Sequence, residues 1–475
     1  MEGGTCAPII ADSSQWAFVH FGGAQLGDRR RTKRAVALAA AMAENPSMSL
    51  PKQLPDWTDL TAAYRLLSND QVLPAALLAP HIAHVREQAA RHPVVLCVQD
   101  DTFLDFTLRT GIEGLGITGD GDGRGLLQHT ALAVLPDKRV LGLLHVAWHA
   151  VQKAPTGETR RQRQARWNVT DVWPDTAAAL GVWPEGSRVI HVCDRHSDVF
   201  RFLRQATELH QEFVVRAEHD RHIDDDSSHL WAKLSAAAVL GQQDVTVRAQ
   251  RTPSNQVKRP GRTAQVTIRT APILVPPPRN DPRTHQCPPL TLWAVYVREE
   301  QPPAGEEAVE WMLLTSLETA TLAQALVLIG YYTCRWVIEE WHRCLKEGCR
   351  IEDSQLDQAA DIQRLAALQG VLAVRLLQMR DLANDPQTAT SPAALAAAVP
   401  ALFVLLVAGL AKVTPDTLTP ALFWRTIARR GGYLGRKHDH RPGWIVVWRG
   451  WSDIVQMVRG AELYRQIAPT GWKCV

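Results

Sequence analysis

Two uninterrupted apolar runs most constrain the fold of this chain. Residues 94–98 read Val-Val-Leu-Cys-Val, and residues 188–193 read Arg-Val-Ile-His-Val-Cys. Short runs of this kind, rich in β-branched residues, predict strands buried on both faces, as in mixed α/β sheets. Gln99, Asp100 and Asp101 end the first run, and Asp194 follows the second. Because ligands of α/β sheets often bind beyond the carboxyl ends of strands, these aspartates are the first candidate site residues.

Length and composition predict a globular protein of two or three domains. The chain has 475 residues, of which 46% are hydrophobic and 21% charged. Its eight cysteines form no C-x-x-C pair and no signal-peptide pattern is present, so we expect free thiols in a reducing cytosol. The apolar run 393–410 contains Pro400 and many alanines, which favours a buried helix or helical hairpin over a membrane span.

The other regions of the chain differ in their predicted secondary structure. Residues 1–80 are predicted to be helical, with Asp28 as the N-cap of an Arg-rich helix and a second helix over 57–67. Further strands are predicted at 127–135 and 139–148 as a hairpin, and throughout 211–317. Residues 350–475 are predicted to be mostly helical. The Arg-rich module is a candidate DNA reader or a plain packing unit.

Positive charge is concentrated locally, although the net charge is only +3. Residues 28–34 and 153–166 each carry five positive and one negative side chain, and residues 245–270 carry six positive and none negative. Such clusters are expected where a protein contacts phosphates, but each alone is more typical of a solvated surface. The candidate DNA-binding residues in the first and third clusters are Arg30, Arg31, Arg34, Lys258, Arg259 and Arg262.

The stretch 331–346 is predicted to be one helix, because no Pro or Gly interrupts it before Gly348. At 100° per residue, four of its polar side chains fall within a 60° stripe, namely those of Tyr332, Arg335, Glu339 and Lys346. Alone, this pattern is typical of an ordinary amphipathic helix. A carboxylate flanked by these groups could also hold a metal ion while its neighbours bind phosphates.

Three carboxylates from distant positions suit phosphoryl-transfer chemistry. Asp100, Asp194 and Glu339 offer the oxygen ligands that Mg²⁺ prefers. A pair of such ions can stabilise both the attacking and the leaving oxygen of an in-line displacement, with water or a 3′-hydroxyl as nucleophile. Cys193 and His196 do not compete as a nucleophile and base, because Cys193 lies within an apolar strand and is expected to pack there.

The spacing Tyr332-(2)-Arg335-(3)-Glu339-(6)-Lys346 matches the signature of the insertion-sequence-four family of DDE transposases, and the chain resembles that family nearly end to end. Other matching blocks are Leu-Gly-Asp-Arg-Arg at 26–30, Ala-Tyr-Arg at 63–65, Gln-Asp-Asp-Thr at 99–102, Val-Ile-His-Val-Cys-Asp-Arg at 189–195, Phe-Val-Val-Arg at 213–216, Glu-Trp-Met-Leu-Leu-Thr at 310–315, Arg-Trp-Val-Ile-Glu-Glu at 335–340, Ala-Val-Arg-Leu-Leu-Gln at 373–378 and Ile-Ala-Arg-Arg-Gly-Gly at 427–432.

The resemblance implies an RNase H-like α/β core in which Asp100, Asp194 and Glu339 bind two Mg²⁺ ions, with Mn²⁺ able to substitute. Asp101 is the alternative at the first position. Asp100 is preferred because it follows the strand directly and because Thr102 then completes the family's Asp-x-Thr. The family's DNA-contacting positions fall on Tyr332, Arg335 and Lys346 for phosphates and the hairpin end, on Arg216 in the active site, and on Trp311, which would stack on a flipped base.

The resemblance also implies a domain order and a reaction. Residues 1–80 would bind double-stranded transposon ends, 81–375 would be catalytic with a β-rich insertion at 217–317 whose basic hairpin touches end DNA, and 376–475 would form a homodimer. The expected activity is cut-and-paste transposition through a hairpin into target DNA, in a bacterial cytoplasm and without a membrane partner. The alternatives are a structure-selective nuclease and a non-catalytic end-binding repressor. The run 393–411 departs from the family pattern.

Overall fold

The structure, a computed structural model, describes residues 12–119, 121–223, 229–247, 250–251, 257–384, 392, 395, 399–436, 439 and 441–467. Its α-helices are α2 (Ser13–Phe21), α3 (Arg29–Glu44), α4 (Leu50–Gln53), α5 (Trp57–Leu67), α6 (Pro74–Ala89), α7 (Arg160–Ala165), α8 (Val172–Leu180), α9 (Phe200–Glu208), α10 (Leu230–Ala236), α11 (Leu322–Thr333), α12 (Trp336–Arg343), α13 (Ala359–Asn384), α15 (Ala401–Ala411), α16 (Pro420–Arg430) and α17 (Trp444–Ile467). Its strands are β1 (Val94–Asp105), β2 (Gly116–Thr118), β3 (Gly123–Val134), β4 (Val140–His149), β5 (Arg188–Cys193), β6 (Glu212–Arg216), β7 (Val239–Val247), β8 (Gln250–Arg251), β9 (Val257–Arg259), β10 (Arg262–Val275), β11 (Leu290–Arg298) and β12 (Glu310–Thr315).

One mixed sheet organises the middle of the molecule. Its strand order is β2-β3-β1-β5-β6-β12-β11-β10-β7, and β4 pairs with β3. Strands β1, β5 and β6 run parallel, whereas β3 is antiparallel to β1 and to β4. The predicted hairpin of β3 and β4 is confirmed. The strands predicted as an insertion continue the same sheet, because β12 pairs with β6 through Thr315↔Val214 and its neighbours.

The two faces of this sheet bury different helices. Leu96, Val98, Ile190 and Val192 belong to the core that α11, α12 and α13 share. Alternate residues on the same strands, such as Cys193, point to the other face and pack with α8 and α9. Because successive side chains of a strand point to opposite faces, residue parity decides which helices a strand residue can meet.

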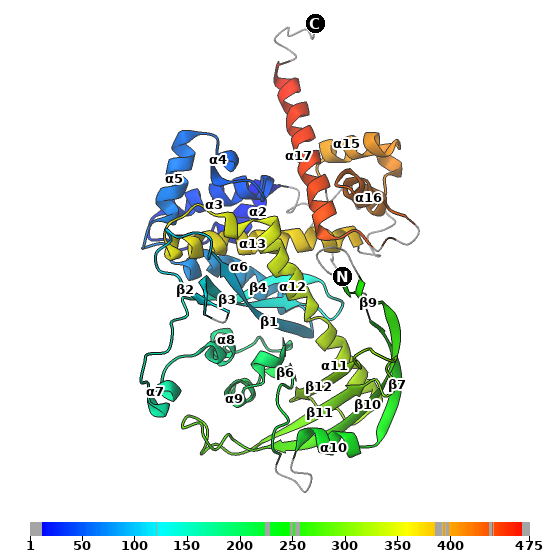
Figure 1. Cartoon of the computed structure of the whole chain (residues 1–475). Coiled ribbons are helices and arrows are strands. Elements are labelled where there is room, and N and C mark those ends of the chain that lie inside the picture. The colour runs from blue at the N-terminus through cyan, green and yellow to red at the C-terminus, as the bar shows by residue number, and fades with distance from the viewer. Residues whose placement is uncertain are drawn as a thin grey trace.

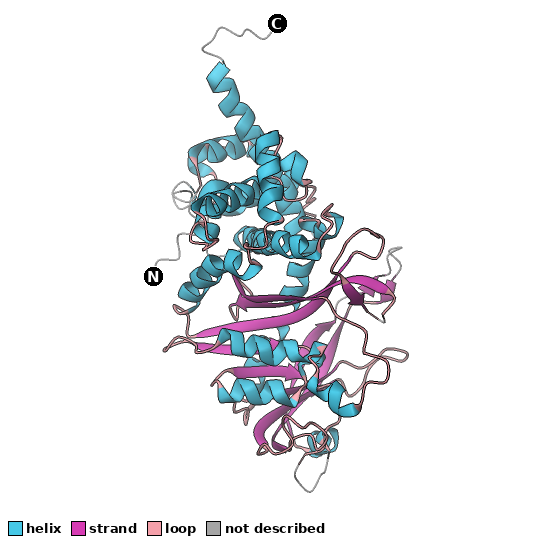
Figure 2. Ribbon diagram, turned by 90° about the vertical axis from the view of Figure 1, so that its left-hand side faces the viewer, coloured by secondary structure: helices cyan, strands magenta, loops and turns pink. Residues whose placement is uncertain are grey.

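Helix α13 crosses between the helical N-terminal region and the sheet, and the C-terminal helices lie beside it at the same end of the molecule (Figure 1). Figure 2 shows the strands gathered at the opposite end. Two buried arginines of α13 fasten the N-terminal region. Arg364 donates to the carbonyls of Leu67 and Val72, and Arg375 donates to that of Ala43. Helices α2 to α6 and α15 to α17 confirm the predicted helical character of both ends, and the predicted N-cap at Asp28 is also confirmed.

The Ala/Leu-rich run 393–411 contributes helix α15 in its described part, whereas residues 393, 394 and 396–398 lie outside the described residues. Phe403, Val404 and Val407 are buried, and Phe403 stacks on Trp451 of α17 at 5.2 Å between ring centroids. No helix among the described residues is long and apolar enough to cross a membrane. The prediction of a helix is confirmed for this part of the run, but the helix is buried on one face only, since Leu405 and Leu410 are exposed.

The prediction of one uninterrupted helix over 331–346 is wrong. Helix α11 ends at Thr333 and α12 begins at Trp336. At the junction, the Thr333 hydroxyl donates to the carbonyl of Gly330, and the backbone N–H of Cys334 bonds three residues back to Tyr331. Side-chain bonds of this kind compete with the regular helical ladder and bend it.

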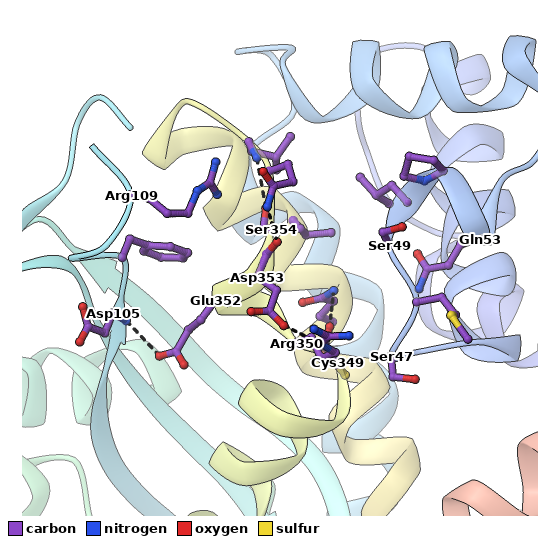
Figure 3. Close-up of a pocket in the computed structure, with 18 of the residues that line it drawn as sticks. Ser47, Ser49, Gln53, Asp105, Arg109, Cys349, Arg350, Glu352, Asp353 and Ser354 are labelled. Atoms are coloured by element: carbon purple, nitrogen blue, oxygen red, sulfur yellow. Dashed lines mark hydrogen bonds and ion pairs between the residues drawn. The ribbon is translucent and has the colours of Figure 1, made fainter. Parts of the chain in front are cut away.

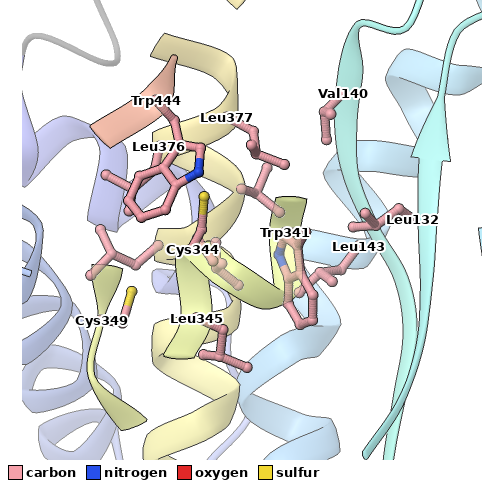
Figure 4. Packing of buried hydrophobic residues seen from close by; sticks show 14 of the residues in the cluster. Leu132, Val140, Leu143, Trp341, Cys344, Leu345, Cys349, Leu376, Leu377 and Trp444 are labelled. Carbon is pink, nitrogen blue, oxygen red and sulfur yellow. The ribbon is translucent and has the colours of Figure 1, made fainter. Parts of the chain in front are cut away.

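A second irregularity comes after α12. Residues Cys344–Gly348 form a π-helical turn, η3, which the N–H of Cys349 closes by donating to the carbonyl of Cys344 at 2.8 Å. The turn is packed between α13 and the start of α17, where Cys344, Leu376 and Trp444 lie together (Figure 4). Such turns add a residue to the helix and rotate the side chains beyond it, and they are frequent at functional sites.

Gly348 allows this close packing. A Cβ at Gly348 would lie 3.0 Å from Leu376 Cδ1 and 3.1 Å from the Trp444 ring, whereas a Cβ at Gly330 of α11 would meet nothing within 4 Å. We expect Gly348→Ala to lower the free energy of unfolding by about 1–3 kcal/mol through overpacking. The matched Gly330→Ala should leave it unchanged or raise it by up to about 1 kcal/mol. Thermal unfolding of the two variants tests this, and equal midpoints would contradict it.

Candidate active site

The strand register brings Asp100 and Asp194 side by side. Strand β1 does not end at the aspartates, as predicted, but pairs with β3 as far as Asp105. What ends there is its pairing with β5, whose last pair is Val98↔Val192. Asp100 and Asp194 each stand two residues beyond that pair. They therefore share the register and face the same side of the sheet, at the point where β1 and β5 separate.

Parity separates Asp100 from its neighbour. Asp100 follows Val98 on the face covered by α11 and α12, whereas Asp101 falls on the other face with Gln99. A pocket of about 440 Å³ lies on the first face. It is lined by Asp100, Asp194, Arg195, His196, Arg216, Glu218, Tyr332, Arg335 and Glu339. This geometry supports the preference for Asp100.

Arg335 joins two of the three carboxylates. It occupies the junction between α11 and α12, and its guanidinium Nη2 donates to Glu339 Oε1 at 2.6 Å. Its Nη1 lies 3.6 Å from Asp100 Oδ2. Because the side chain of Arg335 is only 10% exposed, these contacts are formed largely out of solvent. The Arg335 guanidinium thus links Glu339 of α12 to Asp100 of β1.

Electrostatics indicate that the pocket suits an added cation. Burial, and next the charge of Asp194, raises the pKa of Asp100 to about 8, which Arg335 opposes. Burial likewise raises the pKa of Asp101. A raised carboxyl pKa shows that the ionised form is poorly compensated. Because burial is the main cause, a cation bound beside Asp100 would stabilise its ionised form.

The donor set fits a hard divalent cation by its chemistry, since all three side chains offer carboxylate oxygens. Among the residues that the structure describes, however, no three His, Cys, Asp or Glu side chains converge closely enough to hold a metal ion. In this structure Glu339 Oε1 is instead paired with Arg335. Holding one ion with all three carboxylates requires Glu339 to turn from Arg335 towards the aspartates.

A polar and aromatic wall adjoins the carboxylates. Arg216 lies two residues beyond Val214, which is on the α11 side of the sheet, and donates to the carbonyl of Glu310 at 2.9 Å. Trp311 and Tyr332 meet edge to face, with ring centroids 5.7 Å apart. Burial raises the pKa of Tyr332, which also has a side-chain hydrogen bond with Arg216. The structure thus brings together three of the predicted DNA-contacting residues.

Lys346 is not part of this pocket. It lies two helical turns beyond Glu339, within the π-turn η3. Its ammonium donates to the carbonyl of Phe103 at 2.6 Å and lies 3.1 Å from Glu352 Oε1. Of the four predicted residues, Tyr332, Arg335 and Glu339 thus line the pocket, whereas Lys346 contacts the strand that carries Asp100.

The predicted basic residues are mostly engaged within the protein. Arg30 pairs with Asp28, Arg31 donates to the carbonyl of Leu26, and Arg34 donates to Asp59. Arg262 forms a two-pronged ion pair with Glu299. The side chains of Lys258 and Arg259, on strand β9, lie outside the described residues. Arg30 is the most open of the described set, with its side chain 91% exposed.

Sequence reasoning missed four residues at this site. Arg195, His196 and Glu218 line the pocket, and Trp336 is 58% exposed with the Arg335 guanidinium over its ring at 4.7 Å. The first two immediately follow Asp194, so their proximity could have been noticed. Trp336 could have been found as an aromatic residue next to the polar stripe of the helix.

Three family models match the chain. Residues 13–72 match the transposase DNA-binding model, residues 169–375 the transposase DDE domain, and residues 403–471 the transposase Tn5 dimerisation domain. The DDE match includes Asp194 and Glu339, whereas Asp100 lies before it. A DDE domain implies an RNase H-like core, in agreement with the order β4-β3-β1-β5-β6. The chain belongs to the Tn5-like DDE transposases, enzymes of DNA phosphoryl transfer.

Proposed function

We propose that this transposase moves DNA by cutting and pasting, with Asp100, Asp194 and Glu339 as its catalytic carboxylates. The observation that supports this proposal best is the shared pocket, in which carboxylates from β1, β5 and α12 adjoin Arg216 and Tyr332. Two Mg²⁺ ions held there would, when bound, favour formation of the attacking oxygen nucleophile and stabilise the leaving oxygen. Mn²⁺ is expected to replace Mg²⁺.

The remaining pocket residues suit a DNA end. Arg216 and Arg335 place two guanidinium groups beside the carboxylates, where they would orient the scissile phosphate and its neighbours. The ring of Trp311 lies against Tyr332 at the margin of the pocket and offers a surface on which an unpaired base would stack. Such a base arises when a freed 3′-hydroxyl attacks the opposite strand and closes a hairpin. This arrangement supports a hairpin intermediate.

The rest of the chain would deliver the DNA. The DNA-binding and dimerisation matches support binding of transposon ends by a homodimer. We place the boundaries of the three regions at residues 80 and 375, with the added strands of 217–317 beside the DNA. Each subunit would bring one end to an active site before both ends are joined to target DNA. The expected location is the cytoplasm of a bacterium.

The proposal is tested by incubating the purified protein with a labelled duplex that ends in the inverted repeat flanking its gene. A hairpin on the transposon end in Mg²⁺ but not in Ca²⁺ is the expected product. Trp311→Ala should lower hairpin formation about tenfold or more while first-strand nicking continues. Nicking without any hairpin would instead indicate a structure-selective nuclease, and binding without cleavage would indicate a repressor.

A further inference from the structure

Lys346 is held by two partners from different parts of the chain. Its ammonium donates to the carbonyl of Phe103 at 2.6 Å and lies 3.1 Å from Glu352 Oε1. The lysine side chain is 27% exposed. An ammonium has three N–H donors, so these two contacts leave one donor for a further ligand. The partly open side chain is therefore oriented without being saturated.

Glu352 also binds the strand that carries Asp100. Its Oε1 accepts the backbone N–H of Asp105 at 3.0 Å. Figure 3 shows Glu352 reaching from its own segment to Asp105 across the edge of a cavity of about 900 Å³. The same carboxylate oxygen thus contacts both β1 and Lys346. Glu352 thus fixes the position of Lys346 relative to β1 at Asp105, which is five residues after Asp100 in the same strand.

The segment that carries Glu352 is itself fixed. Glu352 lies in the short helix η4 (Ile351–Asp353), which begins after Arg350 in the left-handed conformation at φ 55°. Just before this helix, the carbonyl of Cys349 accepts a hydrogen bond of 3.1 Å from the side chain of Gln369, a residue of α13. Ile351 is fully buried. The position of the carboxylate is therefore set by packing rather than by Lys346 alone.

We propose that Glu352 is a positioning residue that holds Lys346 with one donor directed to a DNA phosphate. The inference rests on the proposed function, in which Lys346 contacts the phosphates of the transposon end. Lys346 lies in the π-turn η3 and outside the pocket that Glu339 lines, so its position relative to the active-site strand depends on its partners. Glu352 provides that relation through β1.

The test measures binding of full-length protein to the labelled inverted-repeat duplex in Ca²⁺. Glu352→Gln keeps an oxygen that can accept the Asp105 N–H, which preserves the fold, but it removes the charge opposite Lys346. Glu352→Ala removes both contacts. Lys346→Ala and the double variant Lys346→Ala with Glu352→Gln complete the cycle. Glu347→Gln is the matched control, because Glu347 lies on the same turn and pairs with Arg343 instead.

Lys346→Ala should weaken DNA binding about tenfold. It should also lower the slope of the logarithm of the binding constant against the logarithm of the salt concentration by about one. Glu352→Gln should weaken binding several-fold and Glu352→Ala further, and Glu352→Gln should have no effect in the Lys346→Ala protein. Glu347→Gln should bind normally. If the two losses multiply in the double variant, or if Glu352→Gln tightens binding, the positioning role is wrong. If Lys346→Ala binds normally, the phosphate contact itself is wrong.

Discussion

Glu339→Gln, Asp100→Asn and Asp194→Asn should each lower single-turnover cleavage of a transposon-end duplex by about a thousandfold or more. Each change removes a negative charge where the reaction needs oxygen ligands for divalent ions. The three side chains line one pocket yet come from β1, β5 and α12, so a shared loss would show that they act together. Binding of the duplex in Ca²⁺ should persist, because these variants keep the shape of the pocket.

Asp101→Asn is the matched control for Asp100→Asn. Asp101 lies next in sequence and its carboxylate is 3.8 Å from His196 Nδ1, which is also 3.9 Å from Asp194 Oδ2, but Asp101 does not line the pocket. We expect a loss of about tenfold or less from this change. If Asp101→Asn abolishes cleavage while Asp100→Asn does not, the first metal-binding position is wrongly assigned.

Mild acid should destabilise this protein, because several histidines are buried in their neutral form. Burial is the first cause in each case and lowers the pKa of His20 to about 3, that of His342 to about 3 and that of His191 to about 4. Their hydrogen bonds fit neutral rings. For example, His81 accepts the N–H of Leu143 through Nε2 and contacts His20 through Nδ1 at 3.0 Å.

The direction of the pH effect on folding stability depends on whether the folded or the unfolded chain binds the proton more strongly. In the unfolded chain a histidine binds a proton below about pH 6.5, whereas these three stay neutral in the folded state until about pH 3–4. The contribution of these histidines to folding stability is therefore complete above pH 6.5 and is lost as the pH decreases below it. At pH 5 the loss is roughly 2 kcal/mol for each histidine.

Thermal unfolding at pH 7 and pH 5 measures this effect. The midpoint should fall by about 5 °C or more between them. His342→Gln replaces one of these groups by a neutral side chain, so the gap between the two midpoints should narrow. Equal midpoints at pH 7 and pH 5 in the unaltered protein would show that burial of neutral histidines does not set the acid stability.

The central strands of the sheet could be predicted from the sequence, because short, continuous apolar runs rich in β-branched residues favour buried strands. Those runs predicted β1 and β5, and the spacing around Glu339 predicted which helix faces them. The structure adds that Asp100 lines the pocket whereas Asp101 does not, which supports the preference for Asp100. Parity alone could not assign the face of either residue, since a buried strand is apolar on both sides.

The positions that could not be predicted depend on irregular backbone or distant partners. The helical stripe assumed 100° per residue, and the π-turn after α12 breaks that assumption before Lys346. Nothing in the spacing marks such a turn. The partners of the basic residues were not predictable either, because Arg34 and Arg262 pair with Asp59 and Glu299, which are 25 and 37 residues away in sequence.

The most direct test of the shared active site is binding of Mn²⁺ to the protein in complex with its transposon-end duplex, followed by electron paramagnetic resonance. Unaltered protein should bind Mn²⁺ tightly, and Asp100→Asn, Asp194→Asn and Glu339→Gln should each lose tight binding, while Asp101→Asn keeps it. Loss in all three variants would show that carboxylates from β1, β5 and α12 hold the same ions. Full Mn²⁺ binding in any one of the three would contradict the assignment of that residue to the site.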